Sequence, residues 1–304
     1  MVYTLGVDIG GTKVATGLID QYGEMHNRSV VASDPSDAEK MFKQVIKSIE
    51  MVLEESKVDL KEIKGMGVGV PGKVDYENGI AIYQNNLPWR NFPIVDRLRE
   101  YFSLENIMID NDVYMATFAE WKFSNIGKQE TFVYLTISTG ISCSIIHKGS
   151  LMRGNGFAGE IGLFPVLARS SPNGFEGLEK IASGPAITKL AEQRFNNPEL
   201  TISEFFSKYV ESDPTAKVLM DDVVGSLAHG IYSIICLLDP HRIVLGGGVV
   251  NNNPLLLDLI KESLNQYLIP EQQHVHEHLY VSALKESSGV IGAGMKGHDC
   301  FTKR

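Results

Sequence analysis

The chain opens with two apolar strands that a pair of glycines separates. Residues 3–20 predict these two strands around the turn at Gly10 and Gly11, and a third strand is expected near residues 24–32. Without a Cβ in the way, the backbone N–H groups of glycines in a tight turn can approach an anion closely. We therefore expect a hairpin that presents a phosphate-binding loop. The competing interpretation is an ordinary hairpin with a Gly-rich turn.

The apolar pattern then changes to helical spacing. One helix is predicted by apolar residues that recur every three to four positions, namely Met41, Phe42, Val45, Ile46, Ile49, Val52 and Leu53. A capping box at Ser36-Asp37-Ala38-Glu39 predicts where it begins. Further helices are expected from about Val113 to Phe123 and near residues 216–238, the latter ending at Asp239-Pro240.

Buried strands are expected between these helices. They comprise Gly65 to Val70, a strand that ends at Met108-Ile109, residues 131–137, and Ile243 to Leu245, which Gly246, Gly247 and Gly248 close. Alternation of strands with helices on this scale predicts an α/β protein with a mostly parallel sheet in each half.

A second hairpin echoes the first. Thr136 to Gly140 aligns with Asp8 to Thr12, and residues 141–147 return as a strand. Two such hairpins indicate a duplicated fold whose halves face each other across a cleft and hold a phosphate tail from both sides. Asp8 precedes the first glycine pair, where it would repel bare phosphate. Its position is explained by a divalent cation between carboxylate and phosphate, and so predicts bound Mg-nucleotide.

A glycine motif at Gly67 to Gly72 fits G-x-G-x-x-G literally but predicts no dinucleotide site. That fingerprint requires a helix at its last glycine, whereas residues 73–79 are rich in turn formers. We interpret the segment as a strand that ends at a loop facing a ligand. No P-loop sequence occurs in the chain.

The catalytic chemistry is expected at Asp110-Asn111-Asp112, between a strand and a helix. A carboxylate at the C-terminal end of a strand points into the cleft of an open α/β sheet. Phosphoryl transfer to an alcohol needs a carboxylate that accepts the hydroxyl proton. A helix N-cap is the plain alternative, and it explains one of the three residues.

Composition narrows the class of protein. The 304 residues are 43% hydrophobic and carry a net charge of −9, which argues against a nucleic-acid surface. The three scattered cysteines lack metal spacing and, without a signal peptide, indicate a reducing cytoplasm. We expect Cys236 to be a buried apolar residue. No apolar run is expected to span a membrane.

Taken together, the motifs resemble the ROK family of bacterial sugar kinases, within the actin-like ATPase superfamily. The resemblance rests on Asp8–Lys13, Pro71-Gly72, Asn86–Trp89, Asn111-Asp112, Gly159–Gly162, Gly177–Gly184 and Leu245–Val249. It implies a duplicated, ribonuclease H-like α/β fold with two domains flanking a cleft. We expect residues 1–115, completed by a C-terminal helix over 289–304, to form the first domain, and residues 116–288 the second.

The resemblance also implies roles for individual residues. Asp112 would be the general base. Around the sugar it places Gly72, Asn86, Asn111, Asp112, Glu160 and Glu179. Near the phosphates it places Asp8, Gly10, Gly11, Thr12, Lys13, Thr139 and Gly140, and near adenosine Gly246 and Gly247. The cofactors would be ATP and Mg²⁺, with Asp8 acting on the metal directly or through water, and the assembly a homodimer without nucleic-acid or membrane partners.

Three departures from the family pattern bear on function. Leu163 stands three residues after Glu160, at the position where the family commonly has a histidine that helps to read the sugar. The cysteine cluster that binds structural zinc in the family is missing from Ala168–Gly177. We expect no zinc site, with packing of Phe164, Leu167 and Phe175 in its place. The second loop, Ser138 to Ser144, lacks several glycines. The chain begins at the first strand rather than with a helix-turn-helix, so a DNA-binding role is not expected.

These features support one leading functional hypothesis and several alternatives. The leading one is an ATP-dependent hexose 6-kinase with a glucokinase-like preference. Loss of the histidine could instead favour N-acetylmannosamine, fructose or β-glucosides, and the altered second loop leaves a catalytically weak sugar sensor open. Separately, His274, His276 and His278 are expected on one face of a strand, where they could bind a transition metal or, more simply, face solvent.

Overall fold

The computed structural model describes residues 1–168 and 174–302 and divides the chain into two compact units. The first comprises Met1–Asn125 with Ser287–Arg304, and the second comprises Ile126–Glu286. The first unit therefore extends past residue 115, where we expected it to end. The reason is that helix α3 (Asp112–Phe123) packs along its length against the C-terminal helix α11 (Ser288–Thr302) in the same unit.

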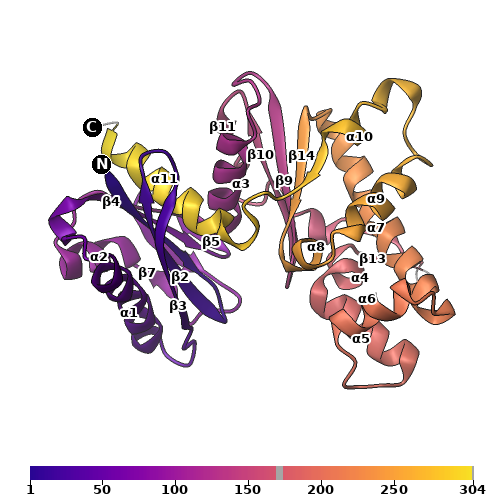
Figure 1. Cartoon of the computed structure of the whole chain (residues 1–304), viewed down its shortest axis with the longest axis horizontal. Helices are drawn as coiled ribbons and strands as arrows, with labels where there is room; N and C mark the ends of the chain where they lie inside the picture. Colours follow the sequence, from indigo (N-terminus) through magenta and orange to yellow (C-terminus); the bar gives the residue numbers. More distant parts are fainter. Residues whose placement is uncertain (169–173, 303–304) are drawn as a thin grey trace. The chain divides into compact units, whose positions relative to one another are not determined.

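A five-stranded sheet forms the centre of the first unit (Figure 1). Its strands, in spatial order, are β3 (Met25–Ala32), β2 (Lys13–Asp20), β1 (Tyr3–Ile9), β4 (Ile63–Val70) and β8 (Ile107–Asn111). Two of the four pairings are antiparallel, so the sheet is mixed rather than mostly parallel. The expected hairpin of β1 and β2 is confirmed.

The second unit repeats this topology. Its sheet runs β11 (Ser150–Leu151), β10 (Ile141–His147), β9 (Thr131–Ile137), β14 (Arg242–Gly246) and β15 (Leu279–Val281). Antiparallel and parallel pairings fall in the same places as in the first sheet. The duplication predicted from two short motifs therefore extends over five strands in each unit.

Smaller elements surround the sheets. The first unit adds α1 (Ala38–Ser56), α2 (Ile94–Phe102), a 3-10 turn at Leu60–Glu62, and a small sheet of β5 (Lys73–Asp75), β6 (Ile80–Tyr83) and β7 (Arg90–Phe92). The second adds β12 (Pro165–Leu167), β13 (Phe175–Gly177), α4 (Glu179–Ala182), α5 (Gly184–Phe195), α6 (Ile202–Val210), α7 (Pro214–Leu238), α8 (Gly248–Asn252), α9 (Leu255–Leu264) and α10 (Val275–His278), with 3-10 turns at Ile161–Leu163, Pro270–Gln272 and Lys285–Ser287.

The start of α1 differs from the predicted capping box. Asp37 is the N-cap residue, and its side chain accepts hydrogen bonds from the backbone N–H groups of Glu39 and Lys40. Ser36 instead donates to Asp34 in the preceding turn. Both residue types can cap a helix, and local sequence does not decide between neighbours.

The two faces of the first sheet are built from different residues. Leu5, Val7 and Ile9 of β1 belong to the apolar core that α1 completes. On the opposite face, helix α11 lies directly against glycines of β1 and β4. A Cβ on Gly67 would sit 1.9 Å from the carbonyl oxygen of Ala293, and one on Gly6 would sit 2.0 Å from that of Val290. Of the β4 glycines, Gly65 and Gly67 thus make room for α11, whereas Gly69 lies against the start of α3.

Helix α7 runs through the core of the second unit and corrects two expectations. Its 25 residues, with a mean hydropathy of 1.3 over the most apolar window, make it long and apolar enough to cross a membrane. Half of that window is buried, including Leu227, Ile231 and Ile235, as is usual for the core helix of a globular unit. Cys236 is exposed on this helix, and Cys143 is the buried cysteine.

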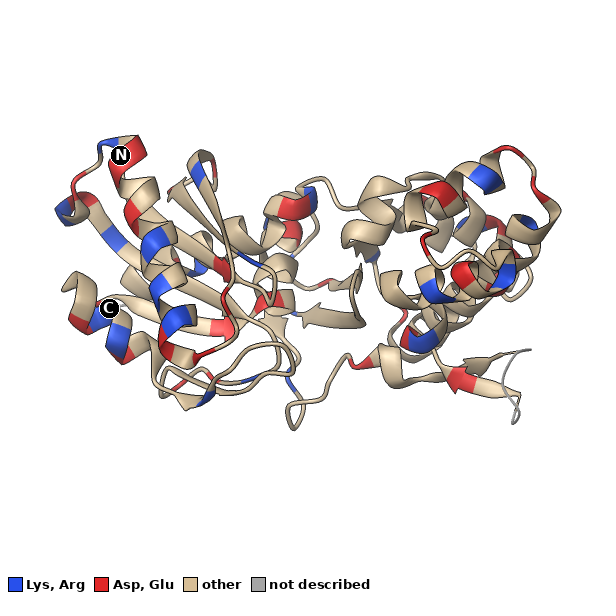
Figure 2. Cartoon of the chain, turned by 90° about the horizontal axis from the view of Figure 1, so that it is seen from below, with Lys and Arg blue, Asp and Glu red and all other residues tan. Residues whose placement is uncertain are grey.

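Charged residues of both signs are interspersed along the helices of each unit (Figure 2). This distribution spreads the net charge of −9.

Candidate active site

The turn between β1 and β2 is held by hydrogen bonds that involve its own backbone. The N–H of Gly10 donates to the carbonyl oxygen of Lys13 at 2.9 Å, and the hydroxyl of Ser33 donates to the carbonyl oxygen of Gly10 at 2.6 Å. Ser33 also donates its N–H to the carbonyl oxygen of Thr12 at 3.0 Å. The predicted phosphate loop, Gly10 to Lys13, is therefore a defined turn tied to the chain that follows β3.

Asp8 stands on the α11 face of the sheet, beside this turn. It lies opposite Gly69 in the register of β1 and β4. Burial, followed by the nearby Asp112 carboxylate, raises the pKa of Asp8 to about 7, against the opposing effect of Lys13 and Arg28. A nearby cation would stabilise the ionised form of this carboxylate by neutralising its charge.

The segment Asp110-Asn111-Asp112 carries β8 directly into α3. Asn111 is the N-cap residue, and its Oδ1 accepts hydrogen bonds from the N–H groups of Val113 and Tyr114. Asp110 is buried and accepts from the N–H of Asn111, whereas Asp112 is partly exposed and accepts from that of Val113. Local capping thus accounts for the Oδ1 of Asn111 and leaves Asp112 as the more exposed carboxylate of this segment.

Gly72 and Asn86 join the same unit's candidate residues from loops. Asn111 donates its Nδ2 to the carbonyl oxygen of Gly72 at 3.1 Å. Gly72 has φ of +76°, and a Cβ there would sit 2.4 Å from the carbonyl oxygen of Tyr83. The side chain of Asn86 packs against Gly11, where a Cβ would lie 2.9 Å from its Nδ2. The first unit therefore brings its predicted sugar residues close to the first phosphate loop.

In the second unit, Glu179 braces the second loop. Its Oε2 accepts a hydrogen bond of 2.8 Å from the N–H of Ile141, and a Cβ on Gly140 would lie 2.7 Å from the same oxygen. Ser138 closes the turn by donating its N–H to the carbonyl oxygen of Gly140 at 2.9 Å. Glu179, predicted as a sugar residue, thus also supports the loop that carries Thr139.

Glu160 and Glu179 lie close enough for their charges to interact. Partial burial, then the charge of Glu179, raise the pKa of Glu160 above its ordinary value. Burial, then the charge of Glu160, raise the pKa of Cys143 to about 12, so its thiol stays protonated. Two carboxylates that repel each other are poised to accept hydrogen bonds from a polyol.

A cavity of about 390 Å³ lies next to the second loop. Its lining carries no charged side chain and consists of Ser138, Thr139, Gly184, Pro185, Thr188, Ile202, Ser203, Gly248, Val249, Asn252 and Asn253. Gly246 and Gly247 are not part of this lining. A Cβ on Gly246 would collide with Tyr134 and one on Gly247 with Ile137, so these glycines allow the tight passage from β14 into α8.

Sequence reasoning missed most of this lining. The Asn251-Asn252-Asn253 run after the glycine motif and the Ser183-Gly184-Pro185 start of α5 were the available signals. Asparagine is favoured at helix ends because its amide can bond the backbone, as that of Asn253 does with the carbonyl oxygen of Val249 at 2.8 Å.

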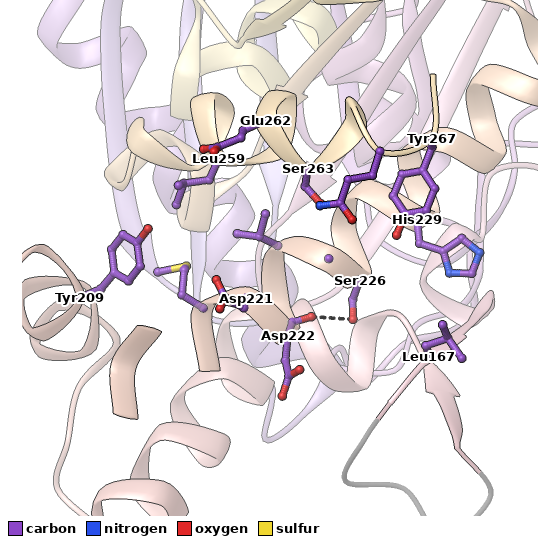
Figure 3. Close-up of a pocket in the computed structure, with 14 residues that line it drawn as sticks. Leu167, Tyr209, Asp221, Asp222, Ser226, His229, Leu259, Glu262, Ser263 and Tyr267 are labelled. Atoms are coloured by element: carbon purple, nitrogen blue, oxygen red, sulfur yellow. Dashed lines mark hydrogen bonds between the residues drawn. The ribbon is translucent and has the colours of Figure 1, made fainter. Parts of the chain in front are cut away.

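A second cavity, of about 570 Å³, contains none of the predicted site residues (Figure 3). It lies between α7 and α9 and carries the acids Asp221, Asp222 and Glu262 beside Tyr209 and Tyr267.

The region without zinc ligands departs from the expected packing. Phe164 packs against the core of the second unit, but Leu167 and Phe175 are exposed and pair across the hairpin of β12 and β13. Strand pairing, rather than burial of these two side chains, holds the segment. Arg169–Asn173, part of the stretch that we noted for lacking cysteine, lies outside the described residues.

The predicted histidine strand is wrong. His274 precedes α10, a short helix that contains His276 and His278, and strand β15 begins only at Leu279. Helical spacing keeps His274 and His278 close, with ring centroids 6.3 Å apart, and places His276 on another face. Among the described residues, the three histidines do not form a cluster of metal-ligand spacing.

Comparison with known proteins gives a consistent result. The ROK family profile matches residues 4–296. The glucokinase of Halalkalibacterium halodurans is 28% identical over 310 residues, covering 95% of this chain and 93% of that protein. The ROK hexokinase of Thermus thermophilus superposes with a TM-score of 0.80 at 28% identity over all of both chains. The ROK glucokinase of Streptomyces griseus, in complex with glucose and AMPPNP, gives 0.80 at 27% identity, covering 98% of this chain and 99% of that one. The chain is a member of the ROK family, with the actin-like α/β fold of its kinases.

Proposed function

We propose that this protein is an ATP-dependent sugar kinase that transfers the γ-phosphoryl group of ATP to the 6-hydroxyl of a hexose, with a glucokinase-like preference. The observation that carries the proposal is the pairing of Asp8 and Asp112 around Gly69. Both side chains are partly exposed. Asp8, whose pKa is raised, suits a cation, and Asp112, at the start of α3, suits a hydroxyl proton. This division matches the needs of phosphoryl transfer to an alcohol.

Asp112 acts as the general base. Its carboxylate accepts the proton of the sugar hydroxyl while the hydroxyl oxygen forms a bond to the γ-phosphorus and the bond to the β–γ bridging oxygen breaks, which leaves ADP. The position of Asp112 at the start of α3, with one oxygen fixed by the N–H of Val113, sets the direction of the carboxylate. Asn111 fixes the same turn and links it to Gly72.

Asp8 fits a role at Mg²⁺. Mg²⁺ prefers oxygen ligands and is usually held by one or two carboxylates together with phosphates and water. The raised pKa of Asp8 indicates a poorly hydrated carboxylate whose charge Lys13 and Arg28 do not fully compensate. A bound Mg²⁺ would neutralise charge on the transferring phosphates, and Asp8 would hold it directly or through water. Gly10 shapes the turn through its own N–H. Gly11 and Thr12 supply backbone N–H groups nearby, and Lys13 supplies a positive side chain.

The nucleotide is assigned to the second unit. The cavity beside Ser138 and Thr139 offers hydroxyls and amides and no charged side chain in its lining, which suits a nucleoside better than a phosphate. Thr139 and Gly140 then serve the phosphates. Gly246 and Gly247 act by shaping the β14–α8 turn, which positions the Gly248–Asn253 wall.

The sugar is assigned to hydrogen-bonding groups that the resemblance identifies in both units. These are Gly72, Asn86, Asn111 and Asp112 in the first, and Glu160 and Glu179 in the second. Carboxylates and amides each engage vicinal hydroxyls, so the set suits a polyol. Leu163 is exposed, and its side chain cannot replace the hydrogen bond of a histidine.

Because Leu163 stands in place of the histidine, N-acetylmannosamine, fructose and β-glucosides are alternative substrates to glucose. The deciding experiment measures ADP release in a coupled assay over this panel and compares kcat/KM. We expect glucose to give the highest value. Sugar-independent ADP release, or binding of sugars without turnover, would favour the sugar sensor instead. An N-acetylmannosamine or β-glucoside preference would retain the kinase and correct its substrate.

A further inference from the structure

We infer that Gly289, in the first turn of α11, is a positioning residue for Asp8. This inference rests on the proposed role of Asp8 at the cation that accompanies ATP. Gly289 lies far from Asp8 in the sequence and carries no functional group. It acts by leaving room for the Asp8 carboxylate and by fixing where that carboxylate points.

The contact involves the whole carboxylate. A Cβ on Gly289 would lie 2.7 Å from Oδ2 of Asp8, 2.9 Å from Cγ and 3.3 Å from Oδ1. Real Cβ atoms do not approach a carboxylate so closely, so any larger residue would displace it. On the other side a Cβ on Gly69 would lie 3.7 Å from Oδ1. The carboxylate is thus confined between two glycines, one on β4 and one on α11.

Asp8 cannot relieve such a clash cheaply. Its backbone is fixed in β1, with Gly69 on one side and Ala15 of β2 on the other. The side chain has only two torsions, so a shift of the carboxylate means a change of rotamer. A change of rotamer would turn the oxygens away from their present position between Gly69 and Gly289.

Helix α11 is also fixed at this end. Ser288 is buried, and its hydroxyl donates a 2.7 Å hydrogen bond to the buried Glu120 of α3. One turn later, a Cβ on Gly292 would sit 1.8 Å from the carbonyl oxygen of Met115. Further along, Thr4 donates its hydroxyl to the carbonyl oxygen of Gly294 at 2.9 Å. The helix therefore cannot move outward to accommodate a side chain at position 289.

Gly289 differs in this respect from the other glycines of α11. Those at 292, 294 and 297 meet backbone atoms or the apolar side chain of Ile19, as expected for simple close packing. Gly289 meets a functional carboxylate. The energetic cost of glycine in a helix, about 1 kcal/mol relative to alanine, is thus incurred at a position where the space serves Asp8.

The first test is a double-mutant cycle in thermal unfolding of the ligand-free protein. Gly289→Ala should lower the unfolding temperature by about 2–4 °C, because the new methyl group collides with the carboxylate. In an Asp8→Ala background the carboxylate is gone, and the same substitution should leave the temperature unchanged or raise it, because alanine favours a helix. Equal destabilisation in both backgrounds would show that Gly289 only packs the helix.

The second test measures function. In Gly289→Ala, affinity for AMPPNP in the presence of Mg²⁺ should fall roughly 10-fold, and kcat should fall roughly 10- to 100-fold, as expected for a displaced group. Affinity for AMPPNP in EDTA and for glucose should stay within about 2-fold, since neither depends on where the carboxylate points. Gly225→Ala is the matched control. It adds a methyl group to helix α7 at a position where, apart from the neighbouring residues and the backbone of the same helix, no atom lies within 4 Å of the new Cβ.

The two tests separate the inference from the proposed function. If the wild-type protein phosphorylates no sugar, the proposed function fails, and the unfolding cycle still decides whether Gly289 places Asp8. If the wild-type protein is active and Gly289→Ala matches it in both Mg²⁺-dependent affinity and kcat, this inference is overturned and the proposed function stands.

Discussion

The two hairpins of the duplicated fold share a topology but differ in chemistry. The first, β1 and β2, carries Asp8 just before a glycine pair, and Gly289 of helix α11 confines its carboxylate. The second, β9 and β10, has Thr136 at the matching position, and an external carboxylate, Glu179, supports its turn. The two units therefore share the hairpin geometry, while only the first hairpin has a carboxylate at this position.

We expect this contrast to compensate for the glycines that the second loop lacks. A loop rich in glycine depends on its own backbone freedom, whereas this loop receives a fixed partner at Ile141 and a turn bond at Ser138. The hydrogen bond from Ile141 to Glu179 and the turn bond at Ser138 would take the place of the additional glycines. The proposed division of work is that the first hairpin handles the cation and the second holds the nucleotide.

The largest effect is expected from Asp112→Asn. Loss of the general base should lower kcat by roughly two to four orders of magnitude. Asparagine can still accept the hydrogen bond from Val113, so the fold and the affinity for glucose should persist. Steady-state kinetics and calorimetric titration measure these two quantities. Asp96→Asn, at an exposed position on α2, is the control, and near-normal turnover in Asp112→Asn would refute the role.

The comparison between hairpins is tested by matched substitutions. Asp8→Asn should lower kcat by roughly 10²- to 10³-fold, because the electrostatic support for the cation is lost. Thr136→Ala, at the equivalent position of the second hairpin, should change kcat by less than about 5-fold, since no charge is removed there. Equal losses in the two variants would contradict the division of work. Glucose affinity should be retained in both.

A smaller effect concerns glutamate 179. Glu179→Ala removes the acceptor for the N–H of Ile141 and should raise KM for ATP and for sugar, each by roughly 10-fold. Glu179→Gln keeps an acceptor oxygen and should raise KM for sugar while KM for ATP stays close to that of the wild type. If both variants leave KM for ATP unchanged, Glu179 does not brace the second loop in solution.

The smallest effect is on stability and follows from the pKa of Asp8. In the unfolded chain this carboxyl ionises near its ordinary pKa of 3.8, whereas in the folded protein it holds its proton up to about pH 7. Between these values the folded state binds more protons, so stability falls as pH rises. Measured in EDTA, wild type should lose on the order of 2 kcal/mol more than Asp8→Asn between pH 5 and 8. Parallel pH profiles for the two proteins would contradict the raised pKa.

The sequence was sufficient to predict the features that local pattern encodes. Both hairpins, the strand that leads into Asp112 and the long helix over residues 214–238 follow from apolar periodicity and turn residues. The family motifs supplied the assignment of roles, which periodicity alone does not give.

The remaining features depend on contacts between distant segments. Gly65 and Gly67 of β4 are explained by α11, which packs against them and lies more than two hundred residues later in the sequence. Cys236 lies in an apolar run, but which helix face is buried depends on the neighbouring elements. The alternation around His276 is too short to distinguish a strand from one helical turn.

The most direct test of the central claim is the stoichiometry of the reaction. Wild-type protein is incubated with ATP, Mg²⁺ and glucose, ADP is quantified, and the sugar product is identified by ³¹P and ¹³C NMR. The account predicts one glucose 6-phosphate for each ADP and no inorganic phosphate above background. ADP that forms with inorganic phosphate and independently of sugar, or no ADP although glucose binds, would contradict it.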